Sequence, residues 1–203
     1  MDNFILISGN KNQSSWSLRA WLMMKIANVD FKVKFIDLST SDYKEQILRY
    51  SPSGKVPALI HNDLVICDSL AIGEYLNELF PNANLYPNTV KERAIARSLT
   101  SEMHAGFIKI RSTMPFRLDY VGKYDDSLTL QQELNRIEEI WSLQRNLYQE
   151  KGDFLFGKFC LIDAMFAPIV IRFAKYGYIP DSISARQYCK SVLEHEFVKE
   201  WIM

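Results

Sequence analysis

Short strand-like segments and amphipathic helical segments alternate over the first eighty residues. Four segments are apolar, or alternate between apolar and polar residues, as β-strands do: 4–8, 31–38, 56–60 and 64–66. Three others place apolar residues at helical spacing: 14–28, 42–50 and 69–79. The turn between the last two strands is expected at 61–63. The resulting order, β-α-β-α-β-β-α, predicts a mixed sheet with helices on its faces.

The pattern changes after residue 80, where strand signals nearly vanish. Residues 81–88 are rich in proline and asparagine, which is typical of a linker. The segments beyond it have helical periodicity: 90–114, 127–151 and 161–176, followed by a pair of short helices within 184–201. We therefore predict an α/β domain over 1–80, a linker over 81–88 and an all-helical domain over 89–203.

Composition excludes several classes of protein. Lysine plus arginine equals aspartate plus glutamate at 24 each, so no net field favours nucleic acid or an anionic membrane. No apolar run approaches the ~20 residues of a membrane span, and no signal peptide is recognised at the start of the chain. Three widely spaced cysteines argue against a disulfide scaffold, a zinc site or a dithiol motif. A soluble, reduced, cytoplasmic protein is expected.

The stretch from Ser51 to Ser69 carries the clearest candidate chemistry. Asp68 and Ser69 are both good helix N-caps, and a helix N-terminus attracts a carboxylate. If the Val56–Pro57 bond is cis, the Val56 backbone can face outward and pair with an extended ligand. A plain hairpin followed by a plain helix cap is the structural alternative.

Four motifs in the chain resemble those of the glutathione S-transferase superfamily. Residues 51–59 are similar to its cis-proline strand, and 68–76 to its acidic-Ser helix start. Residues 14–19, Ser-Ser-Trp-Ser-Leu-Arg, resemble the signature of the serine-type, zeta-like classes, although zeta proteins usually have cysteine where Trp16 stands. Residues 160–163 resemble the capping box of the helical domain's core helix, with Cys160 at the cap position. The resemblance implies a thioredoxin-like N-terminal domain followed by the family's helical C-terminal domain.

The resemblance also implies a function and partners. It implies a cytoplasmic homodimer that uses glutathione as co-substrate, without a metal, and conjugates it to small electrophiles in detoxification. One alternative is a glutathione-dependent cis–trans isomerase of a dicarboxylic substrate, of maleylacetoacetate or maleylpyruvate type. Another is a glutathione- or ligand-binding protein without turnover.

Site residues follow from the same resemblance. Ser14 is the first candidate to hold the glutathione thiolate and Ser15 the second, with helix capping as the alternative role. Val56, before Pro57, is expected to pair with the cysteinyl backbone. Ser69 is expected to hold the γ-glutamyl carboxylate, Asp68 the α-amino group and Lys55 the glycyl carboxylate.

The second substrate is expected against the long helix after the linker. One broad face of that helix would carry four candidates: His104, Phe107, Arg111 and Met114. Arg111 could clamp a carboxylate of the substrate with two hydrogen bonds. Arg172 and Lys175 are expected at the surface.

Overall fold

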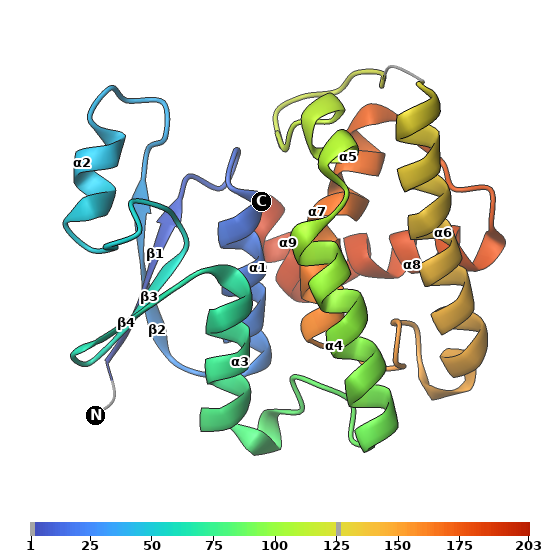
Figure 1. The fold of residues 1–203 in the computed structure, drawn as a ribbon, viewed down its shortest axis with the longest axis horizontal. Coiled ribbons are helices and arrows are strands. Elements are labelled where there is room, and N and C mark those ends of the chain that lie inside the picture. Colours follow the sequence, from blue (N-terminus) through green and yellow to red (C-terminus); the bar gives the residue numbers. More distant parts are fainter. Residues whose placement is uncertain (1–2, 125–126) are drawn as a thin grey trace. The chain divides into compact units, whose positions relative to one another are not determined.

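The computed structural model describes residues 3–124 and 127–203. The chain forms two compact units, the first ending at Leu85 and the second beginning at Tyr86 (Figure 1). This division falls inside the linker predicted over 81–88. The exact bounds of the predicted domains, 1–80 and 89–203, and of the linker stay a prediction.

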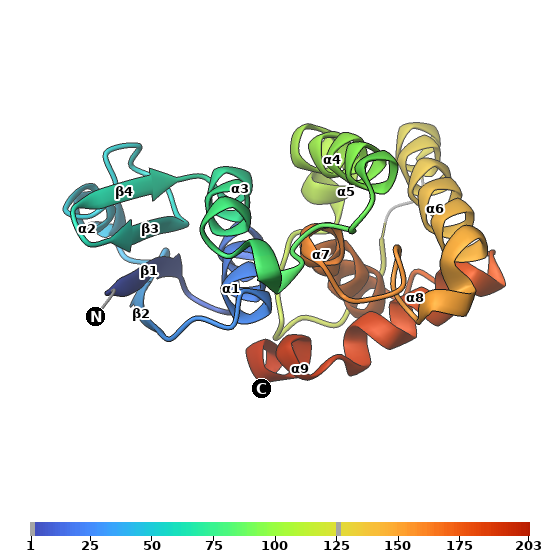
Figure 2. The same ribbon diagram turned by 90° about the horizontal axis from the view of Figure 1, so that it is seen from below.

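The first unit confirms the predicted order of strands and helices. Its elements are β1 (Phe4–Gly9), α1 (Ser15–Ile26), β2 (Phe31–Ile36), α2 (Tyr43–Leu48), β3 (Ala58–His61), β4 (Leu64–Cys67), α3 (Ser69–Leu79) and a short 3-10 helix, η1 (Pro81–Ala83). The strand order is β2-β1-β3-β4, with β1 parallel to β2 and the other pairs antiparallel. Helices α1 and α3 lie side by side on one face of the sheet, and α2 lies on the other (Figures 1 and 2).

Strand β1 is central in the sheet and is covered on both faces, which explains its nearly continuous apolar run. Leu6 and Ile7, which point to opposite faces, are both fully buried. On the α2 face, Ile7 packs in a cluster with Ile36 of β2 and Ile47 of α2. The core thus fixes α2 against the sheet, although α2 has only six residues.

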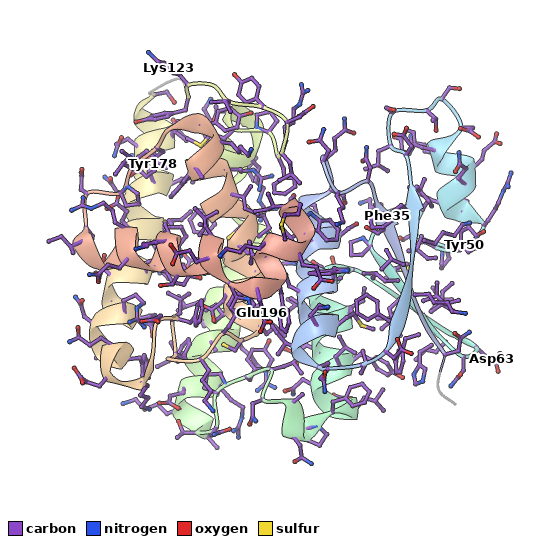
Figure 3. The ribbon with its side chains drawn as sticks, turned by 180° about the vertical axis from the view of Figure 1, so that it is seen from behind. Phe35, Tyr50, Asp63, Lys123, Tyr178 and Glu196 are labelled. Atoms are coloured by element: carbon purple, nitrogen blue, oxygen red, sulfur yellow. The ribbon has the colours of Figure 1, made fainter. Side chains whose placement is uncertain are left out.

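The hairpin of β3 and β4 is tighter than expected. His61 was predicted in the turn but is the last residue of β3, where it pairs with Leu64. The turn consists of Asn62 and Asp63, and Asn62 adopts a positive φ of 53°, which asparagine tolerates well. Figure 3 labels Asp63 beside this hairpin tip.

The second unit is helical, as predicted. Its elements are α4 (Val90–Ala105), α5 (Ile108–Thr113), α6 (Leu128–Tyr148), the 3-10 helix η2 (Gln149–Lys151), α7 (Leu161–Tyr176), α8 (Ile183–Glu194) and α9 (Glu196–Ile202). Helix α7 has the predicted bounds and is buried along most of its length, with Pro168 inside it. Of the described helices, none combines the length and apolar character that crossing a membrane requires.

The prediction of one continuous helix over 90–114 is wrong. Helix α4 ends at Ala105, and Phe107 adopts a left-handed conformation with φ 57° before α5 begins. The carboxylate of Glu133, on α6, accepts the amide hydrogens of Lys109 (3.1 Å) and Ile110 (2.8 Å). A distant side chain therefore caps the new helix, and local periodicity contains no sign of it.

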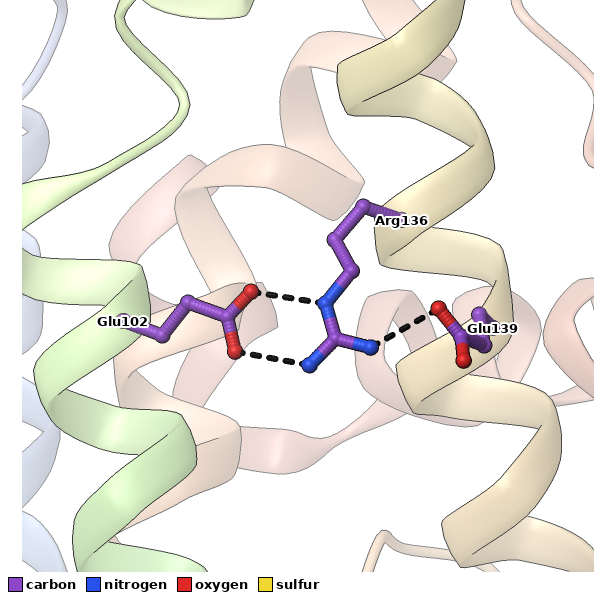
Figure 4. Close-up of polar contacts among 3 residues, drawn as sticks. All are labelled: Glu102, Arg136 and Glu139. Carbon is purple, nitrogen blue, oxygen red and sulfur yellow. Dashed lines mark hydrogen bonds and ion pairs between the residues drawn. The ribbon is translucent and has the colours of Figure 1, made fainter.

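Helices α4 and α6 are also joined by an ion-pair network. Arg136 on α6 binds both carboxylate oxygens of Glu102 on α4, at 2.7 and 2.9 Å, and donates to Glu139 at 2.8 Å (Figure 4). The two-pronged geometry orients the planar guanidinium between the two helices.

Candidate functional site

The first unit contains a cavity of about 710 Å³ between α2, the loop before β3, and the start of α3. This volume is within the usual range of small-molecule sites, roughly 300–1,000 Å³. It is lined by Trp16, Leu38, Tyr43, Lys44, Ile47, Ser53, Gly54, Lys55, Val56, Pro57, Cys67 and Asp68. Apolar side chains dominate the walls, and two lysines and one aspartate supply charge.

The backbone around Val56 forms one wall of the cavity. The Val56–Pro57 peptide bond is cis, as the proposed backbone pairing required. Among the described residues, neither the N–H nor the C=O of Val56 has a hydrogen-bond partner. The fully buried Ser51 hydroxyl holds the preceding segment by donating to the carbonyl of Lys55 at 2.9 Å. This wall therefore offers one donor and one acceptor on an anchored backbone.

The start of α3 borders the same cavity at Asp68. Asp68 is the N-cap of the helix, and its carboxylate accepts the amide hydrogens of Leu70 (2.8 Å) and Ala71 (3.4 Å). It adopts φ 84°, a strained conformation for a residue with a side chain. Ser69 follows it, fully buried, and its hydroxyl has no hydrogen-bond partner among the described residues. A buried hydroxyl without a partner costs free energy, and an atom that accepted its hydrogen would recover that cost.

The serines at the start of α1 form a small hydrogen-bonded network. Ser14 is the N-cap: its Oγ accepts the amide hydrogen of Ser17 at 3.3 Å, and its hydroxyl donates to Ser17 Oγ at 2.7 Å. Ser17 Oγ also accepts the amide hydrogen of Gly9 at 3.0 Å. Ser14, Ser15 and Ser17 are all buried. The capping role expected as an alternative for Ser14 is thus present, and Ser15 is the first residue of the helix.

Gly9 brings β1 unusually close to this network. A Cβ added at this position would lie 2.8 Å from Ser14 Cβ and 2.7 Å from a methyl carbon of Leu38. Both distances are too short for carbon atoms, so only glycine fits here without displacing Ser14.

A turn after β2 orders the loop that carries Leu38 to the cavity wall. The Asp37 carboxylate accepts the amide hydrogen of Ser39 at 2.9 Å and its hydroxyl at 2.7 Å. These bonds, led by the one from the Ser39 backbone, lower the pKa of Asp37.

The structure brings most of the predicted residues of the first unit together. Lys55, Val56, Pro57 and Asp68 line the cavity, and Ser69 lies directly behind Asp68 in the chain. Among the described residues, Ser14 and Ser15 are not on its wall, whereas Trp16 is. Four further residues on the cavity wall were not predicted there: Trp16, Tyr43, Lys44 and Cys67. The recognised amphipathic helix over 42–50 could have indicated Tyr43 and Lys44.

The Trp16 ring is held from within its own helix. The guanidinium carbon of Arg19, a nearly fully buried residue, lies 4.6 Å from the ring centroid, within the range of a cation–π contact. Because Arg19 is one helical turn further along α1, this contact fixes the orientation of the indole at the cavity wall.

The four candidates of the second unit do not share one helix face, because the helix breaks between them. Phe107 lies in the break and is buried, as is Met114 after α5. Arg111 donates to the backbone carbonyls of Met103 and His104, the latter at 3.1 Å, and so satisfies the end of α4. Burial lowers the pKa of Arg111.

Arg172 was expected at the surface, but it is buried. Its side chain donates to the carbonyls of Met114 (2.8 Å) and Pro168 (3.2 Å) and lies against the Phe116 ring. Burial, with a contribution from the charge of Arg111, lowers the pKa of Arg172 to about 9. Lys175 is partly exposed.

The described residues contain no group of three or more histidine, cysteine, aspartate or glutamate side chains that could hold a metal ion.

Comparison with known proteins identifies relatives of parts of this chain. Residues 13–79 match the model of the glutathione S-transferase N-terminal domain. A probable maleylacetoacetate isomerase of Caenorhabditis elegans is 35% identical over 102 residues, which cover 50% of this chain and 47% of that protein. Glutathione S-transferase 1 of Dianthus caryophyllus is 38% identical over 91 residues, covering 44% and 40%. The chain thus spans about half or less of the length of these relatives.

Solved structures resemble the chain over nearly its whole length. A glutathione transferase homolog from Burkholderia, solved with bound glutathione, superposes with a TM-score of 0.73 at 23% identity, covering 98% of this chain and 96% of that one. Glutathione transferase Omega 3C from Trametes versicolor gives a TM-score of 0.75 at 18% identity, covering 98% and 88%. At these identities the likeness establishes the fold, which is the predicted thioredoxin-like domain followed by a helical domain.

Proposed function

Residues 13–79 match the model of the glutathione S-transferase N-terminal domain, and from this match we propose that the protein binds glutathione and activates its thiol. Glutathione lies along the Val56 backbone in the cavity of the first unit. Its thiolate then attacks small electrophiles. The Burkholderia homolog of the same fold, solved with bound glutathione, supports this ligand.

The observation that carries the proposal is the Ser69 hydroxyl, fully buried and without a partner among the described residues. It belongs to the first residue of α3, where the helix dipole favours negative charge. A carboxylate at this position accepts the hydroxyl hydrogen and is stabilised by the helix N-terminus. Glutathione supplies such a carboxylate on its γ-glutamyl residue, on the same carbon that carries a primary amine.

The remaining polar groups of the cavity match the rest of the tripeptide. The N–H and C=O of Val56 pair with the cysteinyl backbone in an antiparallel manner. Asp68 takes the α-amino group, since it lines the cavity and directly precedes Ser69 in the chain. Lys55 takes the glycyl carboxylate, and Lys44 on α2 is a second cation on the cavity wall.

The thiol needs modest help to ionise near neutral pH. A cysteine thiol has a pKa near 8.5, so ionisation at pH 7 requires about 2 kcal/mol. A hydroxyl hydrogen bond to a charged group contributes ~1.5–3 kcal/mol. One serine, Ser14 first and Ser15 second, is therefore sufficient, and the thiol proton passes to solvent. The thiolate sulfur forms the new bond to carbon, and the leaving group departs with its bonding electron pair.

A glutathione-dependent cis–trans isomerase is the second candidate, favoured by the similarity to the probable maleylacetoacetate isomerase of Caenorhabditis elegans. In that reaction the thiolate adds to the double bond, rotation follows, and the sulfur leaves again. The substrate contacts predicted for His104, Phe107, Arg111 and Met114, the homodimer and the cytoplasmic location stay predictions.

Titration calorimetry and turnover test the proposal together. The wild-type protein should bind both glutathione and S-methylglutathione, since both carry the same carboxylates. The Ser14→Ala variant should bind S-methylglutathione as the wild type does, but lose at least tenfold in turnover of an aromatic halide or of a cis-alkene dicarboxylate. Wild-type protein that takes up neither peptide would refute glutathione binding, and full turnover in Ser14→Ala would refute the role of Ser14.

A further inference from the structure

Ser17 has a position in the serine network that the capping of α1 does not require. Capping needs only the Ser14 oxygen, which accepts the amide hydrogen of Ser17. The Ser17 side chain is fully buried, and its Oγ lies 2.7 Å from Ser14 Oγ. Among the described residues, its own hydroxyl hydrogen has no acceptor in this structure, in which the Ser14 hydroxyl donates to Ser17 Oγ.

The Gly9 amide fixes the direction in which Ser17 can act. Its N–H donates to Ser17 Oγ at 3.0 Å, and this bond occupies one lone pair of that oxygen. The other lone pair accepts the Ser14 hydroxyl in this structure. A hydroxyl can exchange donor and acceptor roles with a neighbouring hydroxyl by rotation alone.

Ser14 cannot donate to a thiolate while its single hydroxyl hydrogen points at Ser17. We propose that Ser17 is a positioning residue, which rotates its hydroxyl to donate to Ser14 Oγ and so turns the Ser14 hydrogen toward the sulfur of glutathione. The resulting chain of hydrogen bonds, which we call the relay, runs from Gly9 N–H to Ser17 Oγ, from Ser17 O–H to Ser14 Oγ, and from Ser14 O–H to the thiolate. No proton changes its heavy atom in this rotation.

Such a chain strengthens its last bond, because each donor polarises the next. The amide of Gly9 and the hydroxyl of Ser17 both draw electron density away from Ser14 Oγ and make its hydrogen a better donor. The close packing of β1 against Ser14 at Gly9 leaves little space around the Ser14 side chain, so Ser14 stays beside Ser17. This inference rests on the proposed function, since it assumes that Ser14 meets the thiol.

The pKa of the bound glutathione thiol, followed by thiolate ultraviolet absorbance in the binary complex, tests the inference. Removing the relay in Ser17→Ala should raise that pKa by about half a unit, the share that one polarising bond adds. Affinity for S-methylglutathione should stay at the wild-type level. If Ser17 only competes for the Ser14 hydrogen, Ser17→Ala should instead lower the thiol pKa, and that result would overturn the inference.

A double-mutant cycle separates this inference from the proposed function. In Ser14→Ala the thiol pKa should rise, and adding Ser17→Ala should then raise it no further; an additive second rise would contradict the relay. Ser17→Cys, whose S–H is a weak donor, should give a value between wild type and Ser17→Ala, and it replaces that variant if alanine prevents folding. Wild-type protein that leaves the bound thiol at its free pKa would refute thiol activation itself. A lowered wild-type value that Ser17→Ala leaves unchanged would refute only the relay.

Discussion

Replacing Ser69 with alanine should change stability and ligand affinity in opposite directions. The hydroxyl is fully buried and has no partner among the described residues, and an unsatisfied buried hydroxyl costs about 1–3 kcal/mol. Ser69→Ala removes that cost, so the ligand-free variant should unfold at a higher urea concentration. Because the contacts of the oxygen are lost as well, the free energy of unfolding should rise by at most about 1 kcal/mol.

The same variant should bind glutathione more weakly. A hydrogen bond to a carboxylate contributes about 1.5–3 kcal/mol, which corresponds to a loss of about 10- to 150-fold in affinity by calorimetry. Ser51→Ala is the matched control, because Ser51 is equally buried but its hydroxyl donates to Lys55 at 2.9 Å. That control should lose stability. A Ser69→Ala protein that is both less stable and undiminished in glutathione affinity would refute the reasoning.

Three further predictions concern the second unit. Cys160 is the N-cap of α7, and its sulfur is a poor hydrogen-bond acceptor. Cys160→Ser should therefore raise the free energy of unfolding, measured by urea titration, by about 1 kcal/mol. An equal or lower free energy of unfolding would contradict this prediction. Burial raises the pKa of Asp163 to about 6, so the folded state keeps a proton that the unfolded chain loses near pH 4. The free energy of unfolding should therefore fall by up to about 3 kcal/mol as the pH rises from 4 to 6. Urea titrations at several pH values measure this fall, and the contribution of Asp163 to it should be absent in Asp163→Asn. Arg136 pairs with Glu102 in a half-exposed setting, so Arg136→Ala should lower the free energy of unfolding by about 0.5–1 kcal/mol at low salt. The loss should be smaller near 1 M salt, because salt screens the ion pair. Urea unfolding curves that give the same loss at both salt concentrations would contradict this prediction.

Most of the first unit could be predicted because each of its elements has a local signal. Short stretches of sequence predict three of its features: the buried strand β1, the helix cap at Asp68 and the segment around the Val56–Pro57 bond. The proline at residue 57 marks the start of β3, although the first ladder residue is Ala58 rather than Val56.

The break between α4 and α5 could not be predicted, because its cause lies outside the local sequence. Glu133 reaches the first amides of α5 from α6, 23 residues away from Ile110. Arg111, expected to face a substrate, donates instead to carbonyls at the end of α4. Helical periodicity continues through such a break, since it reports which face is apolar and not which backbone bonds are made.

Cavity roles were missed where a residue contributes through three-dimensional packing. Trp16 was noted only as a departure from the serine motif, yet it lines the cavity and rests on Arg19. Only the distances from Gly9 and Ser14 assign Ser17 a place in the network. Sequence spacing identifies the serines, but it does not say which oxygen faces which.

The crystal structure of the protein with glutathione tests the central claim most directly. The γ-glutamyl carboxylate should accept the hydroxyl hydrogen of Ser69, the cysteinyl backbone should pair with Val56, and the sulfur should lie within hydrogen-bonding distance of Ser14 Oγ. A tripeptide bound outside this cavity, or bound with its γ-glutamyl end away from α3, would contradict the account.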